Sequence, residues 1–218
     1  MYTAVGDGGT GPGRKVGRKP AFDAEDVVAA AIAEGLDRFT MAAVAARVGV
    51  VTAAIYRLFP SRDQLVLACL DTAAATIATP PEGAGWREAL HLWADECWRV
   101  CEDFPGLSRL VYSFPPAFTR IEDVLAAYSA TLMAHGRTPR QAMFALDFIG
   151  DTVFASHLGV EAMRMVDDEG ARGLDRVREV LGDGPTVLQP DESWTGRAAL
   201  DTKIDFIVAG LDRSWPEL

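Results

Sequence analysis

The chain has 218 residues, a hydrophobic content of 49% and a formal net charge of −10 at pH 7. This hydrophobic fraction is typical of a globular protein, and the length allows one large domain or two small ones. Apolar runs are short and no charged segment precedes an apolar one at the N-terminus, so neither a transmembrane helix nor a signal peptide is predicted. Three cysteines without paired spacing argue against a disulfide framework and favour the cytoplasm.

The negative charge is distributed unevenly along the chain. Residues 1–66 carry eight Lys/Arg and seven Asp/Glu, whereas residues 67–218 carry 13 and 24. The acidic charge therefore belongs to the C-terminal part. Such an asymmetry indicates that the two parts of the chain have different partners.

Residues 1–20 are glycine-rich and then basic, without a periodic apolar pattern, and predict a flexible basic arm. GDGGTGPG at 6–13 is only superficially similar to a phosphate-binding loop, because no predicted strand precedes it and no Lys-Ser/Thr ends it. The basic side chains of the arm could contact DNA phosphates or the minor groove, as homeodomain arms do, or form a solubilising tail. These side chains are Arg14, Lys15, Arg18 and Lys19.

Three helices are predicted within residues 21–66. The first spans about 24–37 by its apolar stripe. Thr40 stands at the N-cap of the second, and Gly49 has the position of the left-handed residue that ends it. The third spans about 52–59. Two short helices joined by a glycine turn form a helix-turn-helix, whose second helix usually enters the DNA major groove.

The spacing of residues around this turn resembles that of the TetR family of bacterial repressors. The matching positions are Ala45-x3-Gly49-Val50, Ile55-Tyr56-x2-Phe59 and Ser61-Arg62-Asp63-x-Leu65. The resemblance implies a helix-turn-helix DNA-binding domain at 21–66, followed by a ligand-binding and dimerisation domain at 67–218.

The resemblance also implies which residues contact DNA. Thr40, Tyr56 and Arg62 are expected at the phosphate backbone, although the Tyr56 ring could instead pack in the three-helix core. Thr52, Ala53 and Ala54 are expected at base edges, with Arg57 as the best candidate for a charged contact. Three positions depart from the common family pattern and make this surface unusually apolar, so the basic arm is expected to supply more of the affinity. They are Ala42, Val51 and Leu58.

The rest of the chain predicts further helices and no strand of comparable strength, so the fold class is all-α. The helices lie at about 62–77, 86–102, 107–112, 120–135, 138–158 and 198–213. Residues 167–193, which are acidic and rich in Gly and Pro, predict a loop with at most one helical insert. Trp86-Arg-Glu-Ala-Leu90, Phe104-Pro-Gly-Leu107 and the helix around Asp205-Phe-Ile-Val resemble the ligand domain of the tetracycline-repressor class.

Aromatic and apolar side chains of these helices predict a pocket for a small hydrophobic effector, although each could be plain core. The candidates are Trp93, Cys97, Trp98, Val111, Tyr112, Phe114, Phe118, Phe144 and Phe148. By resemblance, Trp93, Cys97 and Val111 occupy the positions of drug-binding and metal-chelating residues, and none is a hard ligand suited to Mg²⁺. We therefore expect a flat hydrophobic molecule rather than tetracycline, with no metal and no cofactor. Cys97 and Cys101 could share a soft metal with a third ligand, but core packing is favoured.

An enzyme is not predicted, because the three histidines are well separated and lie in no recognisable catalytic motif. The surplus of apolar positions at about 138–158 and 198–213 predicts a homodimer through a four-helix interface. Its candidate residues are Phe154, Leu200, Ile204, Ile207, Val208 and Leu211. The predicted function is a homodimeric repressor that leaves a near-palindromic operator when it binds its effector. The alternative is an all-α small-molecule binding protein or enzyme with vestigial DNA binding.

Overall fold

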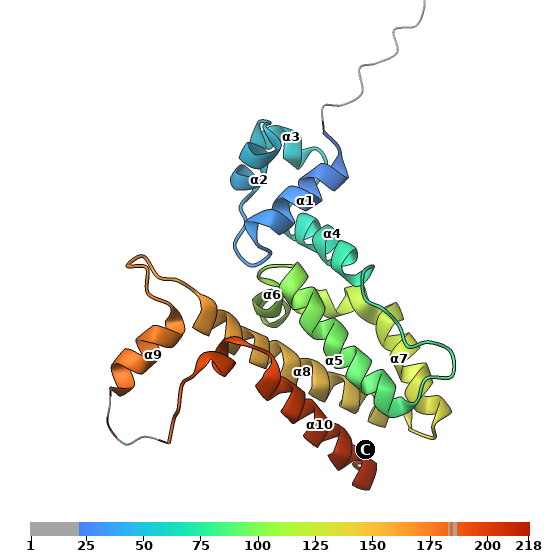
Figure 1. Cartoon of the computed structure of the whole chain (residues 1–218). Helices are drawn as coiled ribbons and strands as arrows, with labels where there is room; N and C mark the ends of the chain where they lie inside the picture. The colour runs from blue at the N-terminus through green and yellow to red at the C-terminus, as the bar shows by residue number, and fades with distance from the viewer. Residues whose placement is uncertain (1–21, 183, 185–186) are drawn as a thin grey trace, which may run out of the picture.

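The computed structural model describes residues 22–182, 184 and 187–218, and the regular structure of this part of the chain is entirely helical (Figure 1). The predicted all-α fold is therefore confirmed. In chain order the helices are α1 (Ala24–Glu34), α2 (Met41–Val48), α3 (Thr52–Tyr56), α4 (Arg62–Ala74), α5 (Trp86–Asp103), α6 (Leu107–Ser113), the 3₁₀ helix η1 (Pro115–Ile121), α7 (Glu122–Ala134), α8 (Pro139–Arg164), α9 (Gly173–Leu181), the 3₁₀ helix η2 (Glu192–Thr195) and α10 (Ala198–Arg213).

Side-chain caps fix where several of these helices begin. The Thr40 hydroxyl accepts a hydrogen bond from the Ala43 amide at 3.1 Å, so α2 starts at Met41. Gly49 ends α2 with a φ of +80°, in the left-handed region that favours glycine. Thr138 and Gln141 form a reciprocal capping box at the start of α8. Because such caps are local in sequence, these helix starts fall where the sequence predicts them.

A first core joins α1–α4 to the C-terminal half of α5 and to α6. Ile55 and Leu65 are fully buried in it together with side chains of α1 and α2. Leu70 of α4 belongs to the same core, as do Val100 and Leu107 from α5 and α6. The predicted boundary at residue 66 thus falls inside α4, a helix that packs against both parts of the chain (Figure 1).

A second core lies between α5, α7, α8 and α10. Trp93, Tyr128 and Leu146 are buried at its centre. By length and composition alone α8 could cross a membrane, but core helices of soluble proteins also satisfy this test, and its inner side fills this core.

The position of α10 corrects the predicted dimer interface. Leu200, Ile204, Val208 and Leu211 are at most 5% exposed because they pack inside the second core of a single protomer. Ile207 is partly buried against the same core, and Phe154 is partly buried between the two cores. An apolar stripe at helical spacing shows that one side of a helix is covered, but not whether the cover is its own chain or a partner. Phe206, which is 79% exposed, marks the outer side of α10.

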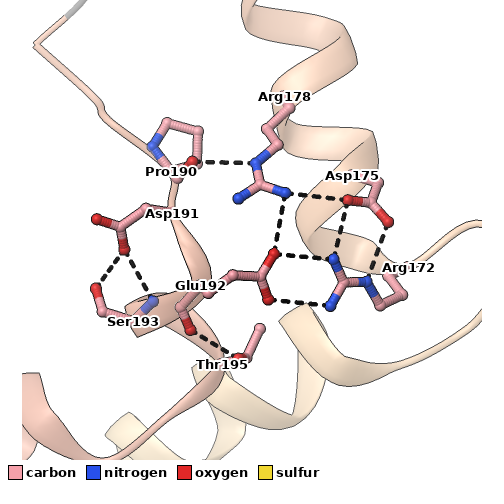
Figure 2. A network of polar contacts seen from close by, with 8 residues as sticks. All are labelled: Arg172, Asp175, Arg178, Pro190, Asp191, Glu192, Ser193 and Thr195. Carbon is pink, nitrogen blue, oxygen red and sulfur yellow. Dashed lines mark hydrogen bonds and ion pairs between the residues drawn. The ribbon is translucent and has the colours of Figure 1, made fainter.

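The segment between α8 and α10 contains α9 and η2, joined by a polar network (Figure 2). Arg172 contacts Asp175 at 3.1 Å and Glu192 at 3.0 Å, and Arg178 contacts Glu192 at 3.2 Å and the Pro190 carbonyl at 3.1 Å. Hydrogen bonds from Arg172 hold the pKa of both carboxyl groups below the ordinary range. These contacts give a solvent-exposed segment a defined conformation.

The loop between α1 and α2 contacts the turn between α5 and α6. The Leu36 amide donates to the Pro105 carbonyl at 2.8 Å, and Arg109 forms an ion pair with Asp37 at 2.8 Å. Gly106, between them, has a φ of +85°, and a Cβ added there would lie 2.8 Å from the Asp37 backbone nitrogen. Only glycine fits this turn without moving the two segments apart.

Gly106→Ala should therefore lower the free energy of unfolding more than Gly83→Ala. Gly83 has a similar φ of +80° but nothing within 4 Å of an added Cβ. The control should lose about 1–2 kcal/mol from backbone strain alone. Gly106→Ala should lose at least about 1 kcal/mol more, because the added methyl group also separates the two segments. Urea unfolding of both variants measures the difference, and equal losses would show that this contact is not tightly packed.

Candidate DNA-binding surface and ligand cavity

The helix-turn-helix is built by α2 and α3, whose axes bend by 103° at the glycine turn. Ala54 and Ile55 point inward and are 5% and 0% exposed. The outer side of the α3 region carries Val51, Tyr56 and Leu58, which are 72%, 47% and 43% exposed. These side chains are therefore accessible to a large partner molecule.

The predicted DNA-contacting residues in and around α3 differ in their exposure to solvent. Ala53, Tyr56 and Arg57 are exposed, and Thr52 is half-buried at the start of the helix. Within the described part of the chain, no hydrogen bond or ion pair engages the Arg57 guanidinium, so it remains able to reach a partner. The prediction for Ala54 is corrected, because burial against the neighbouring helices keeps it from any base edge.

Arg62 has a different role from the one predicted. Its guanidinium donates to the carbonyls of Phe39 at 3.1 Å and Leu36 at 3.2 Å, and lies 4.5 Å from the centre of the Phe39 ring. These contacts tie the start of α4 to the loop before α2 and use the Nε and Nη2 donors, which leaves only Nη1 for a phosphate. The Thr40 hydroxyl is likewise used as the cap of α2. The Thr40 cap was predicted from the sequence, whereas the matching motif position gave no sign of the Arg62 contacts.

The charge of the helix-turn-helix is not favourable for DNA on its own. Residues 22–66 carry four basic and six acidic side chains. One of the four, Arg47, forms an ion pair with Glu34 at 2.6 Å. The basic residues predicted to assist, Arg14, Lys15, Arg18 and Lys19, lie outside the described residues. DNA binding by this surface would depend strongly on that arm.

A small apolar cavity lies between α4, α5, α6, η1 and α8. The space open to the centres of water-sized molecules is about 50 Å³. Its wall consists of Leu70, Ala73, Ala74, Ile77, Trp93, Cys97, Val100, Leu107, Val111, Ala117, Phe118, Arg120, Ile121 and Phe154. Trp93, Cys97, Val111 and Phe118 were predicted to line a ligand pocket, and the structure brings these four together.

Five other predicted ligand residues lie outside this cavity. Trp98 is buried with its ring 5.0 Å from that of His157, and Phe114 packs against the first core. Tyr112 is half-exposed and its hydroxyl donates to the Asp151 carbonyl at 3.3 Å. Phe144 and Phe148 are exposed on α8 with their rings 5.8 Å apart. Aromatic residue type alone does not say toward which side of a helix a ring points.

The contribution of α4 to the wall was not predicted, and of η1 only Phe118 was. Leu70 and Ala73 stand at i and i+3 on α4, and Ile77 lies just after the helix ends at Ala74. The sequence interpretation left this spacing unassigned. The 3₁₀ helix η1, which begins at Pro115, places Phe118 and Arg120 at the cavity. The helical periodicity of α4 was the signal that could have identified its part in the wall.

The polar atoms next to the cavity are already paired or buried. The Trp93 indole N–H donates to the Leu146 carbonyl at 2.8 Å. Burial raises the pKa of the Cys97 thiol well above its usual value, so this cysteine remains a neutral apolar group. No group of three His, Cys, Asp or Glu side chains suited to a metal ion occurs among the described residues. The cavity is suited to an apolar molecule.

The C-terminal end of α4 is tied firmly to the second core. Glu96 accepts a hydrogen bond from the Ala78 amide at 2.8 Å, and Arg99 donates to the Thr76 carbonyl at 2.7 Å. The Tyr128 hydroxyl donates to the Ala78 carbonyl at 2.7 Å. Hydrogen bonding from Arg99 lowers the pKa of Glu96, so its carboxylate is charged near neutral pH. We call Glu96, Arg99 and Tyr128 the α4 anchor.

A buried histidine joins α8 to α5 and α6. The His157 ring is hydrogen-bonded to the Ser108 hydroxyl at 3.2 Å and lies 3.4 Å from Glu102. Burial lowers its pKa, and the Glu102 carboxylate opposes this effect only in part. The neutral ring is therefore the form that the fold favours.

A helix-turn-helix with an exposed second helix thus precedes a helical domain that contains an apolar cavity. The family model of bacterial regulatory proteins, tetR family, matches residues 28–69, from α1 into α4. The helices of the rest of the chain complete a fold like that of the TetR-family protein structures described below.

The HTH-type transcriptional repressor DrrR1 of Streptomyces coeruleorubidus is 34% identical over 115 residues. This match covers 50% of the chain and 42% of that repressor, so the chain spans less than half of this relative's length.

Two solved structures resemble the whole chain. A variant of TetR from Acinetobacter baumannii AYE, in complex with minocycline, has a TM-score of 0.65 at 22% identity, and the match covers 90% of this chain and 99% of that one. ActR of Streptomyces coelicolor, in complex with actinorhodin, has a TM-score of 0.66 at 20% identity, with coverage of 88% and 97%. At such identities the likeness establishes the fold.

His157 should make the stability of the protein sensitive to mild acid. Because its folded-state pKa lies below the unfolded value of about 6.5, the unfolded chain takes up the proton first as the pH falls. Stability should thus be constant above about pH 7.5 and decline through pH 6.5 and below. In the His157→Gln variant this decline in stability should be smaller. The control is His91→Gln, because the His91 side chain is 43% exposed, and it should keep the full decline. Urea unfolding at pH 7.5 and 5.5 measures the effect, and equal declines in both variants would contradict it.

Proposed function

We propose that this protein is a cytoplasmic transcriptional repressor that binds a near-palindromic operator as a homodimer and leaves it when a small hydrophobic effector binds. One observation carries the proposal: α4 joins the helix-turn-helix and also forms one wall of the apolar cavity. A molecule in the cavity would act directly on the helix that positions the DNA-binding surface.

The second helix of the motif, α3, would enter the major groove. Arg57 is the exposed charged group suited to a base edge or phosphate, and Tyr56 is exposed beside it. Ala53 and Val51 are exposed apolar groups of a kind that can contact thymine methyl groups. In a two-fold dimer the two α3 helices would lie about one DNA turn, roughly 34–36 Å, apart.

The small size of the cavity supports a mechanism in which the effector displaces α4 and so releases the operator DNA. A space of about 50 Å³ is far smaller than the roughly 300–1,000 Å³ of a typical ligand site, so an effector must push the walls apart. The α4 anchor holds the C-terminal end of that helix, and the end that carries the DNA-binding domain is then the one that moves. Ligand binding and operator binding would oppose each other by the same factor.

The outer sides of α8 and α10 provide a surface for a second copy of the chain. Phe148 and Phe206 are 46% and 79% exposed there. Between these helices runs a groove lined in part by the small residues Ala155, Gly159 and Ala199, where helices can approach closely. This surface replaces the buried residues predicted from the sequence, and its aromatic side chains are the anchors expected of a dimer interface.

Selection of bound duplexes from a random DNA pool at near-physiological salt should recover a palindromic motif. On that operator, alanine at Arg14, Lys15, Arg18 and Lys19 should reduce the salt dependence of binding, by about 0.9 in the log–log slope for each lost phosphate contact. Arg87→Ala, on α5, is the control and should leave the slope unchanged. A folded dimer that enriches no sequence would favour the alternative, an all-α binding protein without DNA function.

Phe206→Glu should convert the protein to monomers, because a carboxylate would be desolvated in the interface. Sedimentation at micromolar concentration measures the change, and operator affinity should fall with it because each half-site is then bound separately. Met133→Glu, at a 44% exposed position on α7, is the matched control. A dimeric Phe206→Glu protein would exclude this surface as the interface.

A further inference from the structure

Arg120 is the only charged residue among those of the described chain that line the apolar cavity. It stands near the end of η1, with its side chain 35% exposed. The guanidinium lies 3.3 Å from the Asp71 carboxylate and donates to the Thr119 hydroxyl at 3.3 Å. The wall that Arg120 helps to form is almost wholly apolar, so its aliphatic stem lines the cavity while its charged end lies at the edge, beside Asp71.

The ion-pair partner of Arg120 connects the cavity to the DNA-binding domain. Asp71 belongs to α4, and the ion pair therefore ties η1 to the helix that carries the DNA-binding domain. The Asp71 side chain is 56% exposed, and such exposed ion pairs are weak. A second anion that arrives from the cavity side, where water is excluded, would interact more strongly with the same guanidinium.

We propose that the effector is an apolar molecule with one anionic oxygen, and that this oxygen replaces Asp71 as the partner of Arg120. The inference rests on the proposed function of the cavity and deepens it. The apolar part of the molecule occupies the space between Leu70, Trp93 and Val111, and the anion lies at the η1 end. Exchange of partners frees Asp71, so the same event that binds the ligand detaches α4 from η1.

A matched pair of fluorescent probes tests the charge requirement on the full-length protein. 1-Anilinonaphthalene-8-sulfonate and N-phenyl-1-naphthylamine share one apolar skeleton, and only the first carries an anion. The wild-type protein should bind the sulfonate at least about tenfold more tightly. Arg120→Gln should remove this preference and leave the neutral probe unaffected, whereas Arg120→Lys should retain part of it because the positive charge remains.

Arg87→Gln is the control, since it removes the same charge from an ion pair with Asp212, away from the cavity. It should keep the full preference for the sulfonate. Asp71→Asn should bind the sulfonate several-fold more tightly than the wild type, because the competing carboxylate is gone, and should bind the neutral probe equally.

The outcomes separate this inference from the proposed function. If the two probes bind equally well, or if Arg120→Gln keeps the preference, the cavity remains a ligand site and the anionic requirement is overturned. Ala74→Trp, which fills the cavity from α4, should abolish binding of both probes. If neither probe binds the wild type, or if Ala74→Trp changes nothing, the cavity is not the binding site and both proposals fail.

Discussion

The anchoring of α4 at one end determines how the rest of the molecule can work. Three side chains of α5 and α7, Glu96, Arg99 and Tyr128, hold the backbone of residues 76–78 through hydrogen bonds of 2.7–2.8 Å. The opposite end of the helix is embedded in the core of the helix-turn-helix domain through Leu65 and Val66. A rigid helix that is fixed at one end converts a small displacement near that end into a larger one at the other end. The cavity lies along the C-terminal half of α4, next to the anchored end.

A second connection limits the directions in which the DNA-binding domain can move. Asp37 and Leu36 contact the turn at Pro105–Gly106 and Arg109, which lies at the start of α6. Leu107 and Val111 of the same helix line the cavity. A ligand that displaces α4 and α6 together would act on both connections to the DNA-binding domain. The neutral His157 beside Ser108 keeps α6 packed on α8, so this second connection is also the one most exposed to a change in pH.

The parts of the structure that follow from local sequence were predicted well, and those that depend on side-chain direction were not. Thr40, Gly49 and Thr138 fix helix ends through contacts within four residues, and the structure has them as expected. The apolar spacing of α10 was correctly identified as a covered stripe, but Leu200 and Ile204 are covered by their own protomer. Arg62 matches a family motif, but its Nε and Nη2 atoms donate hydrogen bonds to backbone carbonyls. A sequence pattern describes which residues share a side of a helix, while the partner on that side is a tertiary property.

The charge of the helix-turn-helix also constrains how the protein could bind DNA. A helix-turn-helix that carries six acidic and four basic side chains repels DNA before any contact forms, and the acidic C-terminal part adds to this repulsion. Specific binding then requires shape complementarity from the exposed apolar surface of α3 together with charge supplied from outside the three-helix core. In such a protein a small rotation of the DNA-binding domain removes the contacts of α3, and phosphate contacts of the basic arm alone would give only non-specific binding. For a DNA-binding surface with so little positive charge, the short displacement of α4 that a ligand in this narrow cavity can cause is therefore enough to release DNA.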